Sequence, residues 1–329
     1  MHLLVTGGAG FIGSHLCDHL IGEGHTVHVL DDLSTGSEAN VRQLEGHEGF
    51  RCTVGSVADA EVLDELVHEA DLVVHLAAAV GVKLVVDSPV RAIETNVHCT
   101  EVVLAHADRH GKPVLIASTS EVYGKSNALP FREDGDLQMG ATDKSRWAYA
   151  CSKAIDEFLA MAYWRERQLP VIVVRLFNTV GPRQTGSYGM VVPTLVGQAL
   201  AGEPLTVYGD GSQMRCFCHV ADVVRALVAL IYDDRARGNV FNVGATAEIS
   251  MLDLARRIIA VTGSSSEICL TTYADAYGDG FEDMYRRIPD IAKLHDLVGW
   301  SPTRSLEDVI RDVVAHQRAT LSGAPKLAA

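Results

Sequence analysis

The sequence of 329 residues has too few basic residues to suit a nucleic-acid-binding protein. It contains 28 lysines and arginines against 42 aspartates and glutamates, which gives a formal net charge of −14 at pH 7. No excess of cations therefore exists to neutralise a phosphate backbone. Any anionic ligand must instead be held by a local cluster of basic side chains.

Long apolar runs and a disulfide framework are also missing. No segment approaches the roughly 18 consecutive apolar residues that span a bilayer. The seven cysteines form an odd set without framework spacing, and Cys216 and Cys218 are one residue too close for a zinc hairpin. We expect reduced thiols and no metal site. Residues 1–5 already read as a strand, which leaves no room for a signal peptide, so we expect a cytoplasmic protein.

Apolar segments typical of buried strands alternate with helical patterns along the chain. Strands are predicted at residues 1–6, 26–30, 71–76, 114–118, 171–176 and 240–243, and helices at 11–21, 57–69, 90–110 and 148–167. This alternation predicts an α/β fold, a doubly wound parallel sheet of the Rossmann kind with helices on both faces. Beyond about residue 246 the alternation fades, and two helical segments appear near 250–262 and 305–318.

A glycine-rich turn joins the first strand to the first helix. Gly7, Gly10 and Gly13 are spaced by three, and such glycines let the backbone approach a pyrophosphate at the positive end of the helix. Asp31 and Asp32 end the second strand, where a carboxylate accepts the ribose hydroxyls and repels a 2′-phosphate. The sequence therefore predicts an NAD site, rather than an NADP site, formed by Gly7, Gly10, Phe11, Ile12, Gly13, Asp31 and Asp32.

Tyr149 and Lys153 are four residues apart and share one face of a predicted helix. A tyrosine hydroxyl titrates near 10 in water. A nearby ammonium, helped by a nicotinamide cation, favours the phenolate and lets it act as a base near neutral pH. The alternative, an ordinary half-exposed pair, is less favoured because a dinucleotide pattern and the strand ending in Ser118-Thr119-Ser120 come before it.

With these motifs the sequence resembles the extended short-chain dehydrogenase/reductase family over roughly residues 1–318. The Gly-x-x-Gly-x-x-Gly spacing is typical of that family, and residues 75–78 are similar to its loop over the cofactor. The resemblance implies cofactor contacts from Ala77, Asn96, Tyr149 and Lys153, and a proton-carrying hydrogen bond from Thr119 to the substrate hydroxyl. One departure is Ser56, since relatives commonly have an aspartate near the adenine at this point.

The resemblance also implies a division into two domains. We expect residues 1–176 and about 216–246 to form the NAD-binding domain. A smaller α+β domain of about residues 177–215 and 247–320 would bind a nucleotide sugar, and residues 321–329 would form a flexible tail. A homodimer through the predicted helices at 90–110 and 148–167 is a further expectation from the family.

The two residues after Thr119 distinguish reactions within the family. Simple 4-epimerases typically have small neutral residues there, and sugar-nucleotide 4,6-dehydratases have an Asp-Glu pair, whereas this sequence has Ser120 and Glu121. Without the acid, dehydration is disfavoured. The Ser-Glu pair resembles nucleotide-sugar decarboxylases that act on UDP-glucuronate. The alternative for Glu121 is an outward-facing residue at a strand end.

A second segment supports the same resemblance. Residues 277–290 are similar to a loop of UDP-glucuronate decarboxylases of the lipid-A-modifying type and of plant apiose/xylose synthases, and residues 144–147 are shared with both. Arg287 matches their active-site arginine, a suitable partner for a carboxylate at C6. Phe281 replaces a tyrosine of the decarboxylases. Ser120 replaces a cysteine of the synthases, so we do not expect ring contraction. A solvated pair with Arg286 is the alternative for Arg287.

Further substrate contacts follow from the resemblance, with Asn178 on the diphosphate and Arg215 on the nucleotide. The expected substrate-binding residues are Lys83, Arg146, Asn178, Arg215, Tyr277 and Arg287. The expected catalytic residues are Thr119, Ser120, Glu121, Tyr149, Lys153 and Arg287. A uridine base is an expectation from the family alone.

The sequence thus predicts an NAD-dependent decarboxylation of UDP-glucuronate through oxidation at C4, giving a UDP-4-keto-pentose, UDP-xylose or both. The main alternative is a 4-epimerase of a UDP-hexose or UDP-uronate, which would use the same tyrosine, lysine and threonine. A cofactor-binding regulatory protein without turnover is a more distant alternative, because it leaves Glu121 and the Tyr149–Lys153 pair unexplained.

Overall fold

A parallel β-sheet forms the centre of the fold in the computed structural model, which describes residues 1–79, 88–186, 190–273, 282 and 284–323. Seven strands follow the order β11-β6-β5-β4-β1-β2-β3, and every neighbouring pair is parallel. The strands are β1 (His2–Thr6), β2 (Thr26–Asp31), β3 (Phe50–Val54), β4 (Leu72–His75), β5 (Val114–Thr119), β6 (Val171–Leu176) and β11 (Asn239–Val243). The strand order reverses between β1 and β4, which is where ligands bind in open α/β sheets.

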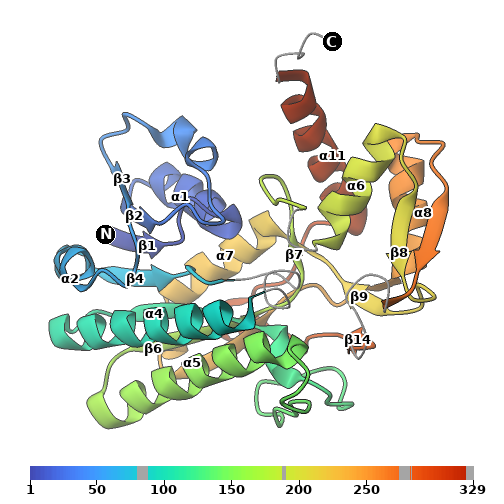
Figure 1. The fold of residues 1–329 in the computed structure, drawn as a ribbon. Helices are drawn as coiled ribbons and strands as arrows, with labels where there is room; N and C mark the ends of the chain where they lie inside the picture. Colours follow the sequence, from blue (N-terminus) through green and yellow to red (C-terminus); the bar gives the residue numbers. More distant parts are fainter. Residues whose placement is uncertain (80–87, 187–189, 274–281, 283, 324–329) are drawn as a thin grey trace.

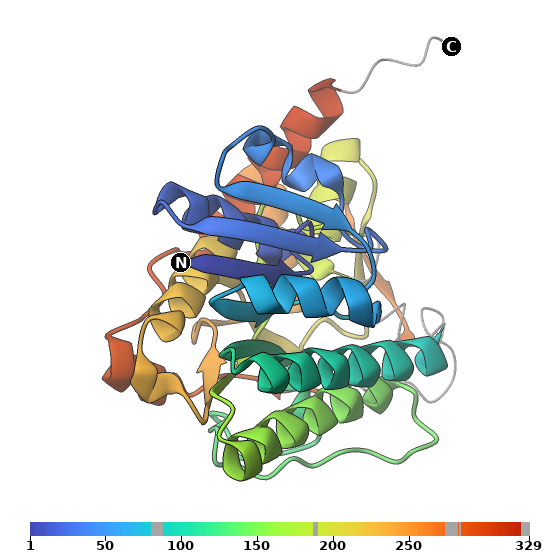
Figure 2. The same ribbon diagram turned by 90° about the vertical axis from the view of Figure 1, so that its left-hand side faces the viewer.

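Helices cover both faces of this sheet, as a doubly wound fold requires. Because side chains alternate along a strand, Leu3 and Val5 pack under one helical layer and Leu4 under the other. The first layer contains α1 (Phe11–Gly22), α7 (Val220–Ile231) and α10 (Ala292–Val298). The second contains α2 (Ala60–Glu69), α4 (Pro89–His110) and α5 (Arg146–Arg167), and Figure 2 shows α4 and α5 side by side on the outside of the molecule. The predicted fold is confirmed.

The later segments build a second apolar cluster beside the sheet, on the right in Figure 1. Its helices are α6 (Val191–Ala201), α8 (Met251–Thr262) and α11 (Leu306–Gly323). Small sheets join β10 (Cys218–His219) to β7 (Thr179–Val180), β13 (Ile268–Thr271) to β8 (Leu205–Tyr208), and β12 (Glu248–Ser250) to β9 (Met214–Cys216) and β14 (Arg286–Arg287). Short 3-10 helices are η1 (Glu38–Asn40), η2 (Arg42–Leu44), η3 (Ser120–Tyr123) and η4 (Asp234–Ala236).

One detail at the end of the chain differs from expectation. Helix α11 continues to Gly323, so residues 321–323 are helical rather than part of a tail. The helix continues because no glycine or proline interrupts it between residues 306 and 322, and glycine at 323 is a common helix stop. Residues 324–329 lie outside the described part, and the predicted domain boundaries stay a prediction. In the part of the chain that is described, no helix is long and apolar enough to cross a bilayer.

Candidate active site

A cavity of about 1610 Å³ opens at the carboxyl ends of the sheet strands, between them and the segments from α6 to β9. Most of the predicted site residues line it, although they come from distant parts of the sequence. They are Gly7, Gly10, Phe11, Ile12, Gly13, Asp31, Asp32, Ala77, Thr119, Ser120, Glu121, Arg146, Tyr149, Asn178, Arg215 and Arg287. Lys83 and Tyr277, also predicted to contact the substrate, lie outside the described residues.

The glycine turn after β1 lets neighbouring backbone segments approach it closely. Gly7 has a φ of +70°, and a Cβ there would lie 2.7 Å from the backbone nitrogen of Ala77. A Cβ on Gly13 would overlap the carbonyl oxygen of Gly7, so only glycine lets α1 lie this near β1. Helix α1 begins after Gly10 with no side chain capping it. Its first N–H groups therefore face the cavity as donors for a pyrophosphate, and this cradle fits NAD.

Asp31 is held at the end of β2 by the same turn. Its Oδ2 accepts a hydrogen bond from the Ala9 N–H and its Oδ1 one from the Leu33 N–H, both 2.9 Å long. Burial raises the pKa of Asp31, although these backbone donors oppose the rise. Each carboxylate oxygen keeps a further lone pair for the ribose hydroxyls. The geometry fits the predicted contact with the adenosine ribose.

Asn96 forms hydrogen bonds with the loop after β4 rather than lining the cavity. It is buried, and its amide makes two hydrogen bonds to the backbone of Ala79 and one to the Ser152 hydroxyl. These bonds hold the loop that carries Ala77 against α5. Asn96 therefore positions the cavity wall, and a direct contact with the cofactor stays a prediction.

Tyr149 lies in the cavity wall, and the Thr119 hydroxyl lies within hydrogen-bonding distance of the Tyr149 hydroxyl. Burial raises the pKa of Tyr149, and the carboxylates of Glu121 and Asp156 raise it further. The lowered pKa predicted from the spacing to Lys153 is thus not produced by the protein's own groups. The reason is that the Lys153 ammonium, itself buried, lies 2.8 Å from Asp156 Oδ2 and pairs with it.

Asp156 is the functional residue that the sequence reasoning missed. It is fully buried, and among the described residues its close cation is the lysine predicted to activate Tyr149. Its spacing of three residues from Lys153 places the two on one helix face. That spacing could have indicated the ion pair from the sequence, but on an exposed helix the same spacing is typical of an ordinary surface ion pair.

Glu121 forms the centre of a buried ionic cluster. It follows β5 in η3, where the Thr119 hydroxyl accepts a hydrogen bond from its N–H. Arg146 donates to its Oε2, and Arg287 Nη1 lies 3.3 Å from its Oε1. Burial alone would raise the pKa of Glu121, but the two arginines outweigh it and lower the pKa to about 2. Glu121 is therefore an inward-facing carboxylate that stays ionised at neutral pH, and the outward-facing alternative is wrong.

The arginines on this side of the cavity come from paired strands. Register aligns Arg287 of β14 with Arg215 of β9, so both side chains belong to the same face and both line the cavity. Arg287 Nη2 donates to Asn178 Oδ1 at 3.0 Å, and Asn178 in turn donates to the Cys216 carbonyl. Arg286 points to the other face and pairs with Glu248. A solvated pair of arginines is therefore excluded, because only one of them is exposed.

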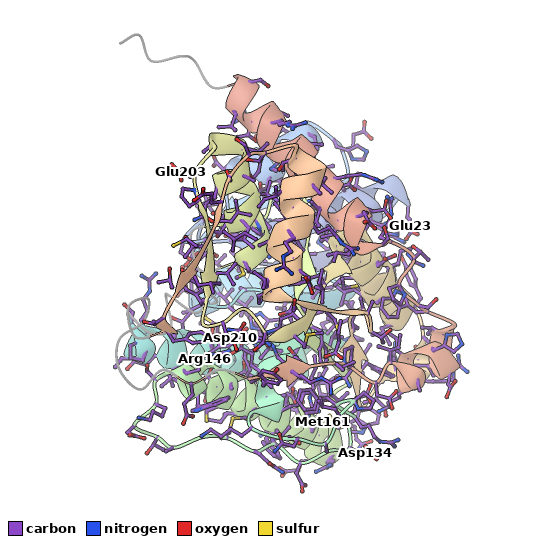
Figure 3. The ribbon with its side chains drawn as sticks, turned by 90° about the vertical axis from the view of Figure 1, so that its right-hand side faces the viewer. Glu23, Asp134, Arg146, Met161, Glu203 and Asp210 are labelled. Carbon is purple, nitrogen blue, oxygen red and sulfur yellow. The ribbon has the colours of Figure 1, made fainter. Side chains whose placement is uncertain are left out.

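The segment that precedes β14 is anchored next to Arg146. Trp147 Nε1 donates to Glu282 Oε2 at 2.8 Å, and Lys125 Nζ lies 2.7 Å from the same oxygen. Figure 3 labels Arg146, the first residue of α5. Residues 144–147 therefore contact the segment before β14 at Glu282. Phe281 lies outside the described residues.

Cys216 and Cys218 are free, buried thiols, as expected. Burial raises the pKa of Cys216 to about 12. At neutral pH this thiol is therefore protonated in the free protein.

Fold and site together define a class, the NAD-dependent short-chain dehydrogenase/reductases that act on sugar nucleotides. A family model described as GDP-mannose 4,6 dehydratase matches residues 4–313. The chain belongs to this extended branch of the short-chain dehydrogenase/reductase family.

The chain is similar to several named relatives and solved structures. The chain is 40% identical over 312 residues to a UDP-N-acetyl-α-D-glucosaminuronate decarboxylase of Bacillus cytotoxicus, covering 94% of this chain and 96% of that protein. It is 37% identical over 319 residues to UDP-glucuronic acid decarboxylase 1 of Xenopus tropicalis, covering 97% of this chain and 72% of that one. A UDP-glucuronic acid 4-epimerase of Bacillus cereus, crystallised with UDP-glucuronic acid and NAD, superposes with a TM-score of 0.88 at 28% identity, covering 97% of this chain and 100% of that one.

Proposed function

We propose that this protein is an NAD-dependent decarboxylase of a UDP-linked uronate, with UDP-glucuronate as the first candidate substrate. The observation that carries this proposal is the buried cluster of Glu121, Arg146 and Arg287 beside Tyr149. Burying a carboxylate is costly, and a simple 4-epimerase has no step that needs one at this point. Relatives named as decarboxylases support the same reading.

The reaction needs a ketone at C4 of the sugar. When bound at the glycine turn, NAD⁺ supplies the hydride acceptor and a positive charge near the base. Tyr149, as phenolate, takes the proton of the C4 hydroxyl, and Thr119 hydrogen-bonds the same oxygen. Oxidation makes the C6 carboxylate a β-keto acid. The C5–C6 bond can then break, since its electron pair passes into the C4 ketone as an enolate and CO₂ leaves.

The charges of the cluster suit that step. Arg287 can hold the C6 carboxylate of the substrate, while the ionised Glu121 repels it. This repulsion destabilises the bound substrate relative to the uncharged CO₂ product. In the free protein the two arginines lower the pKa of Glu121 to about 2 and keep it ionised, so we assign delivery of the C5 proton to water or Tyr149. A returned hydride at C4 gives a UDP-pentose such as UDP-xylose, and release before that gives the 4-keto sugar.

The 40% identity to a decarboxylase named for an N-acetylated uronate supports a second candidate substrate. The two substrates differ at C2, so the reaction and the roles above apply to both. A 4-epimerase remains the rival reaction, and it would interconvert C4 configurations without losing carbon.

Apolar side chains on the outer helices support the expected homodimer. Val90 and Ile93 of α4 are 66% and 40% exposed, and Ile155 and Phe158 of α5 are 49% and 71% exposed. The two helices form one face (Figure 2), and a second copy would bury this surface. Phe158→Glu should halve the mass measured by sedimentation, whereas Leu270→Glu, on an exposed strand elsewhere, should not. A wild-type monomer would contradict the dimer.

The reaction is tested by incubating the protein with each uronate and following CO₂ and nucleotide sugars. Release of CO₂ with stoichiometric formation of a UDP-pentose or its 4-keto form supports the proposal. Conversion of UDP-glucuronate to UDP-galacturonate without CO₂ would identify an epimerase. No NADH signal with any nucleotide sugar would favour the regulatory protein.

A further inference from the structure

A group of potential metal ligands lies at the end of the sheet opposite the cavity. His2 begins β1, His28 is the third residue of β2, and Glu69 is the last residue of α2. One ring nitrogen of each histidine and one carboxylate oxygen of Glu69 all lie within 4.8 Å of one another. None of the three lines the cavity.

The sheet register explains why these side chains meet. Leu4 pairs with His28 in the parallel register of β1 and β2, and Leu4 packs against α2 in the core. Since side chains two residues apart share a face, His2 and His28 also point to the side that α2 covers. The final turn of α2 brings Glu69 over them.

Each histidine is already oriented by a threonine. His2 Nδ1 lies 2.9 Å from the Thr26 hydroxyl, and His28 Nε2 lies 2.9 Å from the Thr53 hydroxyl. The Thr26 hydroxyl donates its own proton to the Met1 carbonyl, so it accepts from His2 Nδ1–H. The lone pair of His2 is therefore on Nε2. Metal-binding histidines typically show this arrangement, with one nitrogen hydrogen-bonded and the other left for the ion.

The second ring nitrogen of His28 is an unusual atom. His28 is 8% exposed, and its Nδ1 is buried without a hydrogen-bond partner among the residues that the structure describes. A buried polar atom without a partner costs free energy. A cation at this point would accept the lone pair and remove that cost.

The surroundings favour positive charge as well. Glu69 ends α2, and the carbonyl groups at the C-terminus of a helix carry partial negative charge. The Asp71 carboxylate is also near, since it accepts a hydrogen bond of 2.7 Å from the His2 N–H. Arg51 faces His28 as a neighbouring cation, but its exposed side chain can turn to solvent.

We propose that His2, His28 and Glu69 form a binding site for a divalent transition metal, Zn²⁺ in particular, with water as the fourth ligand. Two imidazoles and a carboxylate are a donor set that zinc accepts. Tetrahedral ligands at zinc bond lengths lie roughly 3.4 Å apart, and the exposed Glu69 side chain is able to close the remaining gap. The ion would tie the end of α2 to β1 and β2, away from the catalytic cavity.

The test uses the untagged full-length protein, stripped with a chelator and titrated with Zn²⁺ by calorimetry and with Co²⁺ by visible absorption. We expect one ion per chain and the intense visible bands of tetrahedral Co²⁺. Glu69→Gln, which changes only an exposed side chain, should weaken binding at least tenfold, and His28→Ala should abolish it. Thr53→Val should weaken binding while leaving all three ligands in place.

Two controls locate the ion. His47→Ala changes an exposed histidine that does not belong to the group and should bind Zn²⁺ as the wild type does. His106→Ala changes a separate cluster between α2 and α4, in which His106, Arg109 and His110 all contact Asp64. Absence of saturable binding would overturn the proposal. So would unchanged affinity in Glu69→Gln and His28→Ala, or loss of binding in His106→Ala. None of these outcomes depends on the decarboxylase activity.

Discussion

Replacing Glu121 with glutamine tests the ionic cluster most directly. The change keeps the shape of the side chain but removes the negative charge between Arg146 and Arg287, whose side chains are 5% and 11% exposed. Two buried cations would then face each other without a carboxylate to offset their repulsion. Removing one partner of a buried ion pair costs about 3–5 kcal/mol.

The pKa of Glu121 leads to a similar magnitude. Its fall from 4.5 to about 2 corresponds to roughly 3 kcal/mol of stabilisation of the ionised form. Because the folded pKa is depressed, this stability is fully present above the unfolded value of 4.5 and is lost as the pH falls through about 2. The gap in unfolding free energy between wild type and Glu121→Gln should therefore be full at pH 7 and shrink between pH 4.5 and 2.

Urea unfolding at several pH values measures this gap, and steady-state kinetics with UDP-glucuronate measure the catalytic effect. We expect kcat for CO₂ release to fall at least a hundredfold without a rise in KM, since the arginines remain to bind the carboxylate. Glu248→Gln is the matched control, because Glu248 pairs with the neighbouring Arg286 at the surface. It should cost less than about 1 kcal/mol and leave kcat unchanged. Equal stability and undiminished CO₂ release in Glu121→Gln would refute the reasoning.

Three further predictions concern the cofactor side. Asp156→Asn removes a carboxylate that raises the pKa of Tyr149, so the rising limb of the pH–kcat/KM profile should move about one unit to lower pH; no movement would contradict this role. Gly13→Ala should destabilise the fold by about 1–3 kcal/mol and abolish NAD binding, whereas Gly22→Ala, with open space around it, should be neutral or stabilising in thermal unfolding. Asp31→Asn should weaken NAD binding at least tenfold in fluorescence titrations; an unchanged affinity would exclude the ribose contact.

The strands of the sheet could be predicted wherever they were buried on both faces. The six apolar segments of the sequence all became strands of the sheet. The exception, β3 at Phe50–Val54, is an edge strand whose side chains are largely exposed. Its sequence therefore lacks the continuous apolar run on which the prediction depends. The short strands β9, β12 and β14 are defined by pairing between distant segments, which a local pattern does not contain.

The candidate site was predictable where a motif carries its own geometry. The glycine turn fixes a backbone path, and the spacing of Tyr149 and Lys153 fixes a helix face. The charge state of Tyr149 was not predictable, because it depends on the burial of Tyr149 and on the nearby carboxylates of Glu121 and Asp156, and Asp156 also pairs with Lys153. The contact between Glu121 and Arg287, 166 residues apart, required the fold, although the resemblance had assigned both residues to one site.

The central claim is that carbon is lost at C6 after oxidation at C4. The most direct measurement incubates the protein with UDP-glucuronate labelled with ¹³C at C6 and follows the label together with the nucleotide sugars by NMR. We expect the label to leave as CO₂ or bicarbonate while a UDP-pentose or UDP-4-keto-pentose accumulates in equal amount. Label retained at C6 of UDP-galacturonate would contradict it.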